Sequence, residues 1–149
     1  MKQIKLQYRQ FGVILLGLCM SSCGGNEETQ NVVTGTAWAA CSPVDGPATR
    51  FEFPVANQQR LIFGLNRDVN SVVGQWNIGN GDTSNGLSVV LCPMDSYNSC
   101  TQIQQGVFRI ESRVDKTVSG SWQLVDTLPS LKNSNFKATL TSVSQPMCG

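Results

Sequence analysis

The sequence predicts an all-β domain, a single antiparallel β-sandwich or small barrel of about eight strands that is stapled by disulfides. Short runs rich in β-branched and aromatic residues recur along the chain, separated by Gly, Asn, Asp, Ser or Pro. No stretch between residues 32 and 149 keeps the apolar spacing of an amphipathic helix over three turns. Several runs instead alternate apolar and polar residues, as expected for an antiparallel sheet with one buried face and one wet face.

Eight segments are predicted to form the strands. They are Val32–Cys41, Arg50–Val55, Leu61–Leu65, Val72–Ile78, Leu87–Cys92, Gly106–Arg113, Val118–Val125 and Phe136–Val143. In three of them the alternation places the following residues on one face, which we expect to be buried: Phe51, Phe53 and Val55; Val118, Gly120, Trp122 and Leu124; Phe136, Ala138 and Leu140. The same phase makes Trp76 and Trp122 core residues. Trp38 is open to two interpretations, packing or stacking on a ligand.

The first 23 residues have the features of an export signal. Lys2, Lys5 and Arg9 form a basic start, and ten uncharged, mostly apolar residues follow from Phe11 to Met20. A membrane-spanning helix needs about twenty such residues. A run of ten therefore indicates the apolar region of a signal peptide rather than a membrane span.

The segment Met20-Ser21-Ser22-Cys23 resembles the lipobox of bacterial lipoproteins, with Met where Leu is usual. The resemblance implies that Cys23 receives a diacylglyceryl group, becomes the first residue after cleavage and carries acyl chains such as palmitate. Residues 1–22 are then the signal peptide, 23–31 a flexible tether and 32–149 the β domain. In a Gram-negative source, Gly24 after the Cys implies export to the outer membrane. The alternative is an ordinary secretory signal, although no A-x-A-like cleavage site is present.

The cysteines fit an exported domain. Removal of Cys19 and acylation of Cys23 leave four, an even number that indicates two disulfides with three arrangements open. Cys92 and Cys100 flank a turn-rich segment between two predicted strands, so we expect a bridge across that hairpin. Cys41 then pairs with Cys148. Zinc binding by the same residues is disfavoured because the chain has no C-x-x-C pair and no histidine.

Composition removes several function classes. The formal net charge is +1 and there is no histidine. A near-neutral chain lacks the basic patch of a nucleic-acid binder, and without histidine it has neither a Ser-His-Asp triad nor a Cys-His pair. We therefore expect no catalytic residues, metal or cofactor. The remaining enzymatic alternative is a hydrolase that uses two carboxylates, for which Glu52 and Glu111 are the acids within predicted strands.

The best candidate for a binding surface is the loop 93–99 between Cys92 and Cys100. The loop is polar and carries Met94 and Tyr97, while its pinned ends reduce the entropy lost on binding. Trp38 is a further candidate contact. The competing interpretation is a stapled hairpin without a partner.

Three functions remain open. The favoured one is a non-catalytic module of the cell envelope, held at the membrane by the N-terminal lipid and binding an envelope protein, a glycan or a small apolar ligand. The second is an inhibitor of an envelope-attacking enzyme. The chain is similar in size and layout to some bacterial lysozyme inhibitors, but Ser119-Gly120-Ser121-Trp122 does not reproduce their S-G-x-x-Y-like motif. The third is the carboxylate hydrolase.

Overall fold

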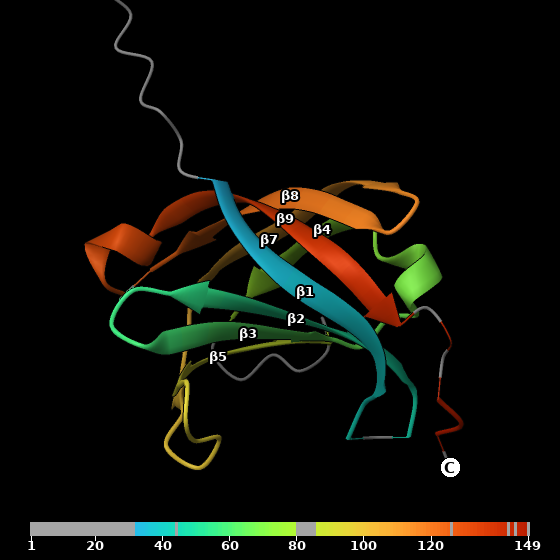
Figure 1. The fold of residues 1–149 in the computed structure, drawn as a ribbon, viewed down its shortest axis with the longest axis horizontal. Coiled ribbons are helices and arrows are strands. Elements are labelled where there is room, and N and C mark those ends of the chain that lie inside the picture. Colours follow the sequence, from blue (N-terminus) through green and yellow to red (C-terminus); the bar gives the residue numbers. More distant parts are fainter. Residues whose placement is uncertain are drawn as a thin grey trace, which may run out of the picture.

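A computed structural model of the chain describes residues 32–43, 45–79, 86–125, 127–142, 144 and 146–148. The signal peptide, the lipidation site Cys23 and the tether 23–31 lie outside these residues, so their assignments stay predictions. No helix within the described ranges is long and apolar enough to cross a membrane. Figure 1 shows that the described part is almost entirely strand.

Nine strands make up one sheet within the described ranges, together with two short 3₁₀ helices. The strands are β1 (Val32–Cys41), β2 (Pro47–Val55), β3 (Gln59–Leu65), β4 (Gly74–Ile78), β5 (Leu87–Pro93), β6 (Thr101–Gln102), β7 (Gly106–Val114), β8 (Thr117–Leu124) and β9 (Asn133–Ser142). The helices are η1 (Val69–Ser71) and η3 (Pro129–Leu131). The strand order is β4-β7-β8-β9-β1-β2-β3-β5-β6.

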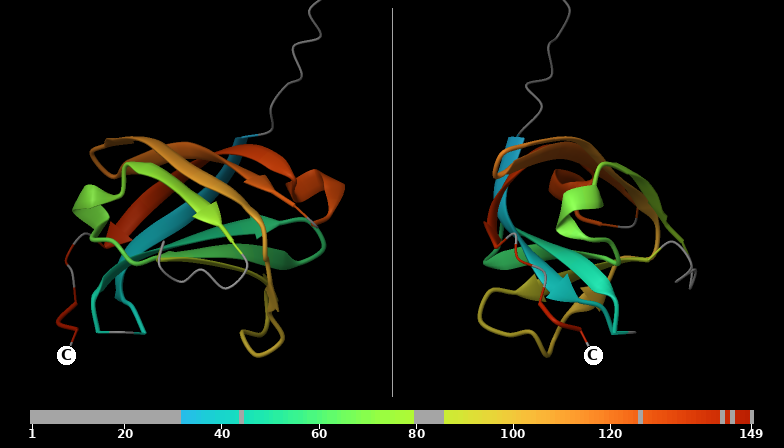
Figure 2. Two further views of the ribbon diagram at one scale, coloured as in Figure 1. Left: turned by 180° about the vertical axis from the view of Figure 1, so that it is seen from behind. Right: turned by 90° about the vertical axis from the view of Figure 1, so that its right-hand side faces the viewer.

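The sheet curls around its own apolar face into a half-barrel, as the two views of Figure 2 show. The predicted all-β fold is therefore confirmed, with one difference in strand direction. All neighbours are antiparallel except β1 and β9, which pair in parallel with Val33 opposite Phe136 and Ala37 opposite Leu140. A parallel pair needs a long connection between its strands. Here the remainder of the domain is that connection, so the first and last strands meet in the middle of the sheet.

Aromatic rings fill the concave side of the sheet. Phe53 lies 5.0 Å from both Trp122 and Phe136 between ring centroids, and Phe63 lies 4.2 Å from Phe108. These five rings come from five different strands, and each is at most 1% exposed. Residues that alternate with them point outward. The three predicted apolar faces are confirmed, because their members are buried or pack against this core.

The strand boundaries shift by up to three residues from the prediction. Thr101 and Gln102 form β6, which was not predicted because its two residues show no alternation. The strand expected from Val72 begins at Gly74, since η1 occupies the residues just before Val72. The final predicted residue, Val143, lies outside the described residues.

The three tryptophans take different positions. Trp122 is 1% exposed, and its Nε1 donates a hydrogen bond to the carbonyl oxygen of Leu131 at 2.9 Å. Trp76 is half-buried and packs against the core, so its prediction is also confirmed. Trp38 lies on the outer side of β1, because its neighbours Ala37 and Ala39 are the residues that point inward.

Candidate functional site

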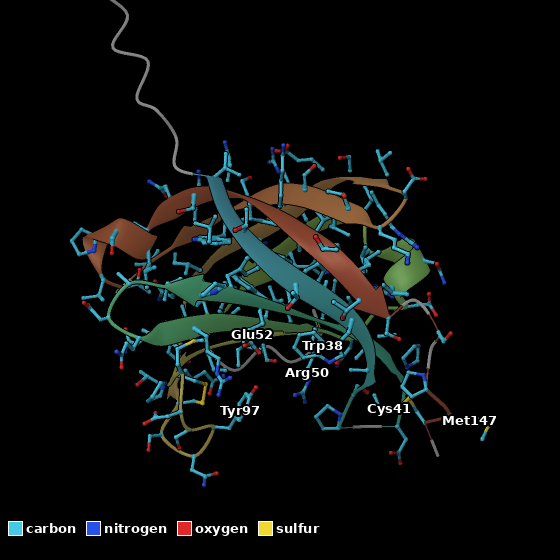
Figure 3. The ribbon with its side chains drawn as sticks, in the orientation of Figure 1. Trp38, Cys41, Arg50, Glu52, Tyr97 and Met147 are labelled. Atoms are coloured by element: carbon cyan, nitrogen blue, oxygen red, sulfur yellow. A yellow bond between two sulfur atoms is a disulfide. The ribbon has the colours of Figure 1, made fainter. Side chains whose placement is uncertain are left out.

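The outer face of β1, β2, β3 and β5 presents side chains in rows that run across the strands. In one row Trp38 lies opposite Arg50, Arg50 opposite Gly64, and Gly64 opposite Ser88. The next row holds Thr36, Glu52, Ile62 and Val90 in the same order. The sheet register therefore brings the cation of Arg50, two aliphatic side chains and several small residues onto one surface. Figure 3 shows how Trp38, Arg50 and Glu52 lie near Tyr97 on this side of the molecule.

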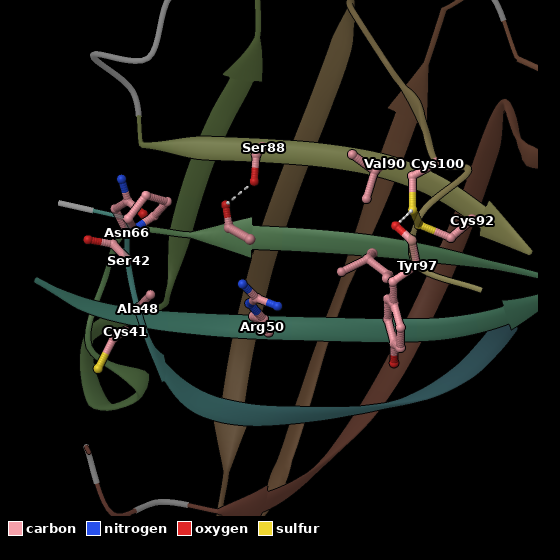
Figure 4. A pocket seen from close by; sticks show the side chains of 13 residues that line it. Cys41, Ser42, Ala48, Arg50, Asn66, Ser88, Val90, Cys92, Tyr97 and Cys100 are labelled. Atoms are coloured by element: carbon pink, nitrogen blue, oxygen red, sulfur yellow. Dashed lines mark hydrogen bonds between the residues drawn. A yellow bond between two sulfur atoms is a disulfide. The ribbon is translucent and has the colours of Figure 1, made fainter. Parts of the chain in front are cut away.

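A groove of about 380 Å³ lies on this face. Three of the four disulfide-bonded cysteines line it, Cys41, Cys92 and Cys100. The other lining residues are Ser42, Pro43, Ala48, Arg50, Ile62, Gly64, Asn66, Ser88, Val90 and Tyr97. In the close-up of Figure 4 the floor is formed by β2, β3 and β5, with Cys41 at one end and Tyr97 at the other.

Both predicted disulfides are present. Cys41 bonds to Cys148 across a sequence separation of 107, with 5.5 Å between Cα atoms. Cys92 bonds to Cys100 across a separation of 8, with 4.2 Å between Cα atoms. The first bridge fixes the end of β1 to the C-terminal segment, and the second closes the loop after β5. The two bridges thus fix the loops at opposite ends of the groove.

The loop closed by Cys92 and Cys100 folds back over the outer face of β3. The guanidinium carbon of Arg60 lies 3.5 Å from the centroid of the Tyr97 ring, and Arg60 Nη1 donates to the Tyr97 hydroxyl at 2.8 Å. The same nitrogen lies 3.4 Å from Glu52 Oε1. Stacking on an aromatic face and pairing with a carboxylate both stabilise a desolvated cation. Arg60 is only 7% exposed, and its Nε is buried without a hydrogen-bond partner within the described part of the chain.

Arg50 contrasts with Arg60. Its side chain is exposed, it lines the groove, and it forms no hydrogen bond or ion pair with any described residue. Beside it, Gly64 leaves space above the sheet. A Cβ added to Gly64 would lie 2.7 Å from the Ser88 Oγ, and that hydroxyl can rotate away. The groove is therefore open because β3 has no side chain at its centre.

A second hollow of about 340 Å³ lies on the far side of Glu52. It is lined by Thr34, Gly35, Thr36, Glu52, Pro54 and Met94. Met94 is 46% exposed and Tyr97 is 61% exposed. Met94 lines this second hollow and Tyr97 lines the groove, so the two candidate residues of the loop belong to different hollows. Trp38 lines neither hollow but is the β1 neighbour of Arg50 in the register.

The two carboxylates of the hydrolase alternative are not brought together. Glu52 is on β2 and Glu111 on β7, with β1, β9 and β8 between these strands. Glu52 is also engaged by Arg60 and Tyr97. The geometry therefore gives this alternative no support. Within the described ranges, no group of three His, Cys, Asp or Glu residues is placed to hold a metal ion.

Sequence reasoning identified Tyr97, Met94 and the disulfides but missed Arg50 and Gly64. Their signal was present in the strand phase, since Arg50 alternates with Phe51 and therefore points outward. The sequence does not show which outward residues of β3 and β5 lie beside Arg50, because that depends on the register of the sheet. The chain matches no protein-family model, and no curated protein or solved structure is significantly similar to it.

Proposed function

We propose that the chain is a lipid-anchored, non-catalytic envelope protein whose β domain binds a ligand in the groove between its two disulfides. The observation that carries the binding role is the groove itself, an open hollow with disulfide-fixed ends and an exposed guanidinium that has no partner among the described residues. A fixed site loses little conformational entropy when it binds, so a modest number of contacts suffices for recognition.

The N-terminal pattern supports the anchoring role. A short apolar segment followed by Met20-Ser21-Ser22-Cys23 resembles a lipoprotein signal, and several acyl chains hold a domain durably at a membrane. The described chain starts at Val32, which is half exposed, at one end of the central strand β1. Residues 23–31 would connect this end of β1 to the lipid.

The anchor is tested by intact mass spectrometry of the full chain extracted from membranes, for wild type and Cys23→Ala. We expect acylation that starts at Cys23 in wild type only, and a mass gain of four protons on reduction of the two disulfides. Cys19→Ala is the matched control and leaves acylation unchanged. A soluble, unacylated product in wild type would refute the anchor.

The groove is tested by co-sedimentation of the membrane-extracted chain with envelope materials, first with purified peptidoglycan sacculi. We expect Gly64→Leu, which fills the centre of the groove, to abolish the binding seen in wild type. Ser121→Leu adds a similar volume on the outer side of β8 and should leave the binding unchanged. Equal binding by Gly64→Leu and wild type would contradict a role for the groove. Release of soluble sugars from the sacculi would contradict the non-catalytic assignment.

A further inference from the structure

We propose that the groove recognises a carboxylate-bearing sugar unit, with Arg50 binding the carboxylate and the sheet face beside it accepting the ring. This inference rests on the proposed binding function and specifies its ligand class. It follows from the kind of groups the groove offers, from its dimensions and from its uncompensated charge.

The floor of the groove offers side chains only. β2 is hydrogen-bonded to β1 and β3, and β3 is hydrogen-bonded to β2 and β5, so their backbone groups are used inside the sheet. An extended peptide is usually recognised through main-chain hydrogen bonds at a free sheet edge. The outermost strands of the sheet are β4 and β6, which do not line the groove, although β6 covers β5 only at Val90 and Leu91, and the floor on β2 and β3 presents no free edge. A ligand that carries its own hydroxyl groups fits this face better than a peptide strand.

The polar groups of the groove match a sugar acid. A guanidinium has five donors and no acceptor, and a carboxylate accepts two of its hydrogen bonds side by side. Arg50 is unpaired among the described residues, and no acidic side chain lines the groove. The Asn66 amide, which donates and accepts, lies in the same lining, and so does the Ser88 hydroxyl, which donates to the Gly64 carbonyl oxygen at 3.4 Å and keeps its acceptor for a sugar hydroxyl.

The remaining surface suits the apolar C–H side of a pyranose ring. Ile62 and Val90 are neighbours across β3 and β5, and the small residues Ala48 and Gly64 line the groove beside them. The Tyr97 ring lines the end of the groove and is held there by its stack on Arg60. An aromatic side chain that is apolar on its faces and polar at its tip is common in ligand sites.

The groove has the size of one or two sugar rings. The floor extends from Ser88 to Cys92 along β5 and two strand spacings across to β2, which corresponds to about 13 Å by about 10 Å. A volume of about 380 Å³ is at the small end of ligand pockets. A large polymer could therefore be held only through one or two of its units.

The charges around the groove leave Arg50 as the cation available to an anion. Arg60 is paired with Glu52 and covered by Tyr97. Asp45 and Asp95 are exposed on the loops that flank the groove, and neither lines it. Because Arg50 is exposed, its attraction for a carboxylate is screened by salt, and we expect binding to weaken as ionic strength rises.

The test is saturation-transfer NMR on the membrane-extracted full chain in detergent micelles, with micelles alone as blank. The probes are glucuronic acid and glucose, which differ only at the carboxylate, followed by N-acetylmuramic acid and N-acetylglucosamine. We expect each acid to bind at least about tenfold more tightly than its neutral counterpart, the range of a hydrogen bond to a charged group. A preference for one acid over the other identifies the sugar series.

The variants test the residue assignment. Arg50→Gln should remove the preference for the acids, and Arg50→Lys should retain part of it because the charge remains. Arg109→Gln is the matched control, since Arg109 is an exposed arginine on the outer side of β7 that bonds to Gln75. Equal binding of acid and neutral sugar, or a preference unchanged in Arg50→Gln, would overturn the inference.

The two proposals fail in different ways. If trialanine, a peptide with a free C-terminal carboxylate, binds through Arg50 while the sugar acids do not, the ligand class is wrong and the groove remains a binding site. If Gly64→Leu retains wild-type co-sedimentation with sacculi, the proposed groove function itself is wrong. Circular dichroism of each variant verifies that the fold is retained before either conclusion is drawn.

Discussion

Removal of the Cys92–Cys100 disulfide tests whether this bridge holds Tyr97 in position over Arg60. The bridge closes a short loop, with a sequence separation of 8. The loss of this constraint on the unfolded chain lowers the free energy of unfolding by about 2.5 kcal/mol. The same relation gives about 4.8 kcal/mol for the Cys41–Cys148 bridge, whose separation is 107.

The contacts of Tyr97 add a second contribution. Its stack on the Arg60 guanidinium and the 2.8 Å hydrogen bond together stabilise the fold by about 2 kcal/mol, since Tyr97 is largely exposed. Ordering the loop 93–99 costs about 1 kcal/mol or more for each residue. Without the bridge this cost exceeds the gain from Tyr97, and we expect the ring to leave Arg60. The net loss for Cys92→Ala with Cys100→Ala is then about 2.5 kcal/mol at most, because the released loop regains the conformational entropy that ordering it cost and this offsets the lost contacts of Tyr97.

The assay is urea unfolding of the purified chain, followed by tryptophan fluorescence, in a double-mutant cycle. Tyr97→Ala should lower the free energy of unfolding by about 2 kcal/mol when the bridge is present and by about zero when it is absent. The Cys41→Ala and Cys148→Ala pair is the control, in which Tyr97→Ala keeps its full effect. An equal effect of Tyr97→Ala with and without the Cys92–Cys100 bridge would refute the reasoning, because the loop would then be held by its own contacts.

Two further substitutions test the packing of the half-barrel. Trp122→Phe should lower the free energy of unfolding by about 2–4 kcal/mol in urea unfolding, because it leaves a cavity and an unpaired carbonyl at Leu131; a loss below about 1 kcal/mol would mean that the site collapses around the smaller ring. Gly120→Ala should lower the melting temperature, at a cost of about 1–3 kcal/mol, because its Cβ would collide with the carbonyl oxygen of Arg109. Gln123→Ala, on the exposed side of the same strand, is the control for both, and an equal effect there would contradict this account.

The strands could be predicted from the sequence because the buried side chains of a strand lie on one face and alternate with outward ones. Phe51 and Phe53 alternate with Arg50 and Glu52, and this period of two is visible without knowledge of any partner strand. The direction of pairing was not predictable in the same way. The β1 and β9 segments have alternation that suits parallel and antiparallel neighbours alike, and only their meeting at the centre of the sheet decides between them.

The disulfides were predictable from spacing and compartment, whereas their role in the groove was not. Cys92 and Cys100 flank a turn, and this local relation indicates a bridge. That the bridged loop turns back over β3 depends on contacts between Tyr97 and Arg60, which are 37 residues apart in the chain. Arg50 begins one predicted strand and Arg60 directly precedes another, and nothing in the local sequence shows that only Arg60 is covered.

The sequence alone determines the all-β class, the buried faces and the pattern that predicts an anchor at Cys23, and it favours one of three cysteine pairings, because each depends on local order or on composition. The tertiary structure alone decides that Arg60 is covered while Arg50 is exposed and has no partner within the described ranges. It also decides that Gly64 opens a groove between the two bridges. These features arise from side-by-side strands and a folded-back loop, so they depend on the register of residues distant in sequence.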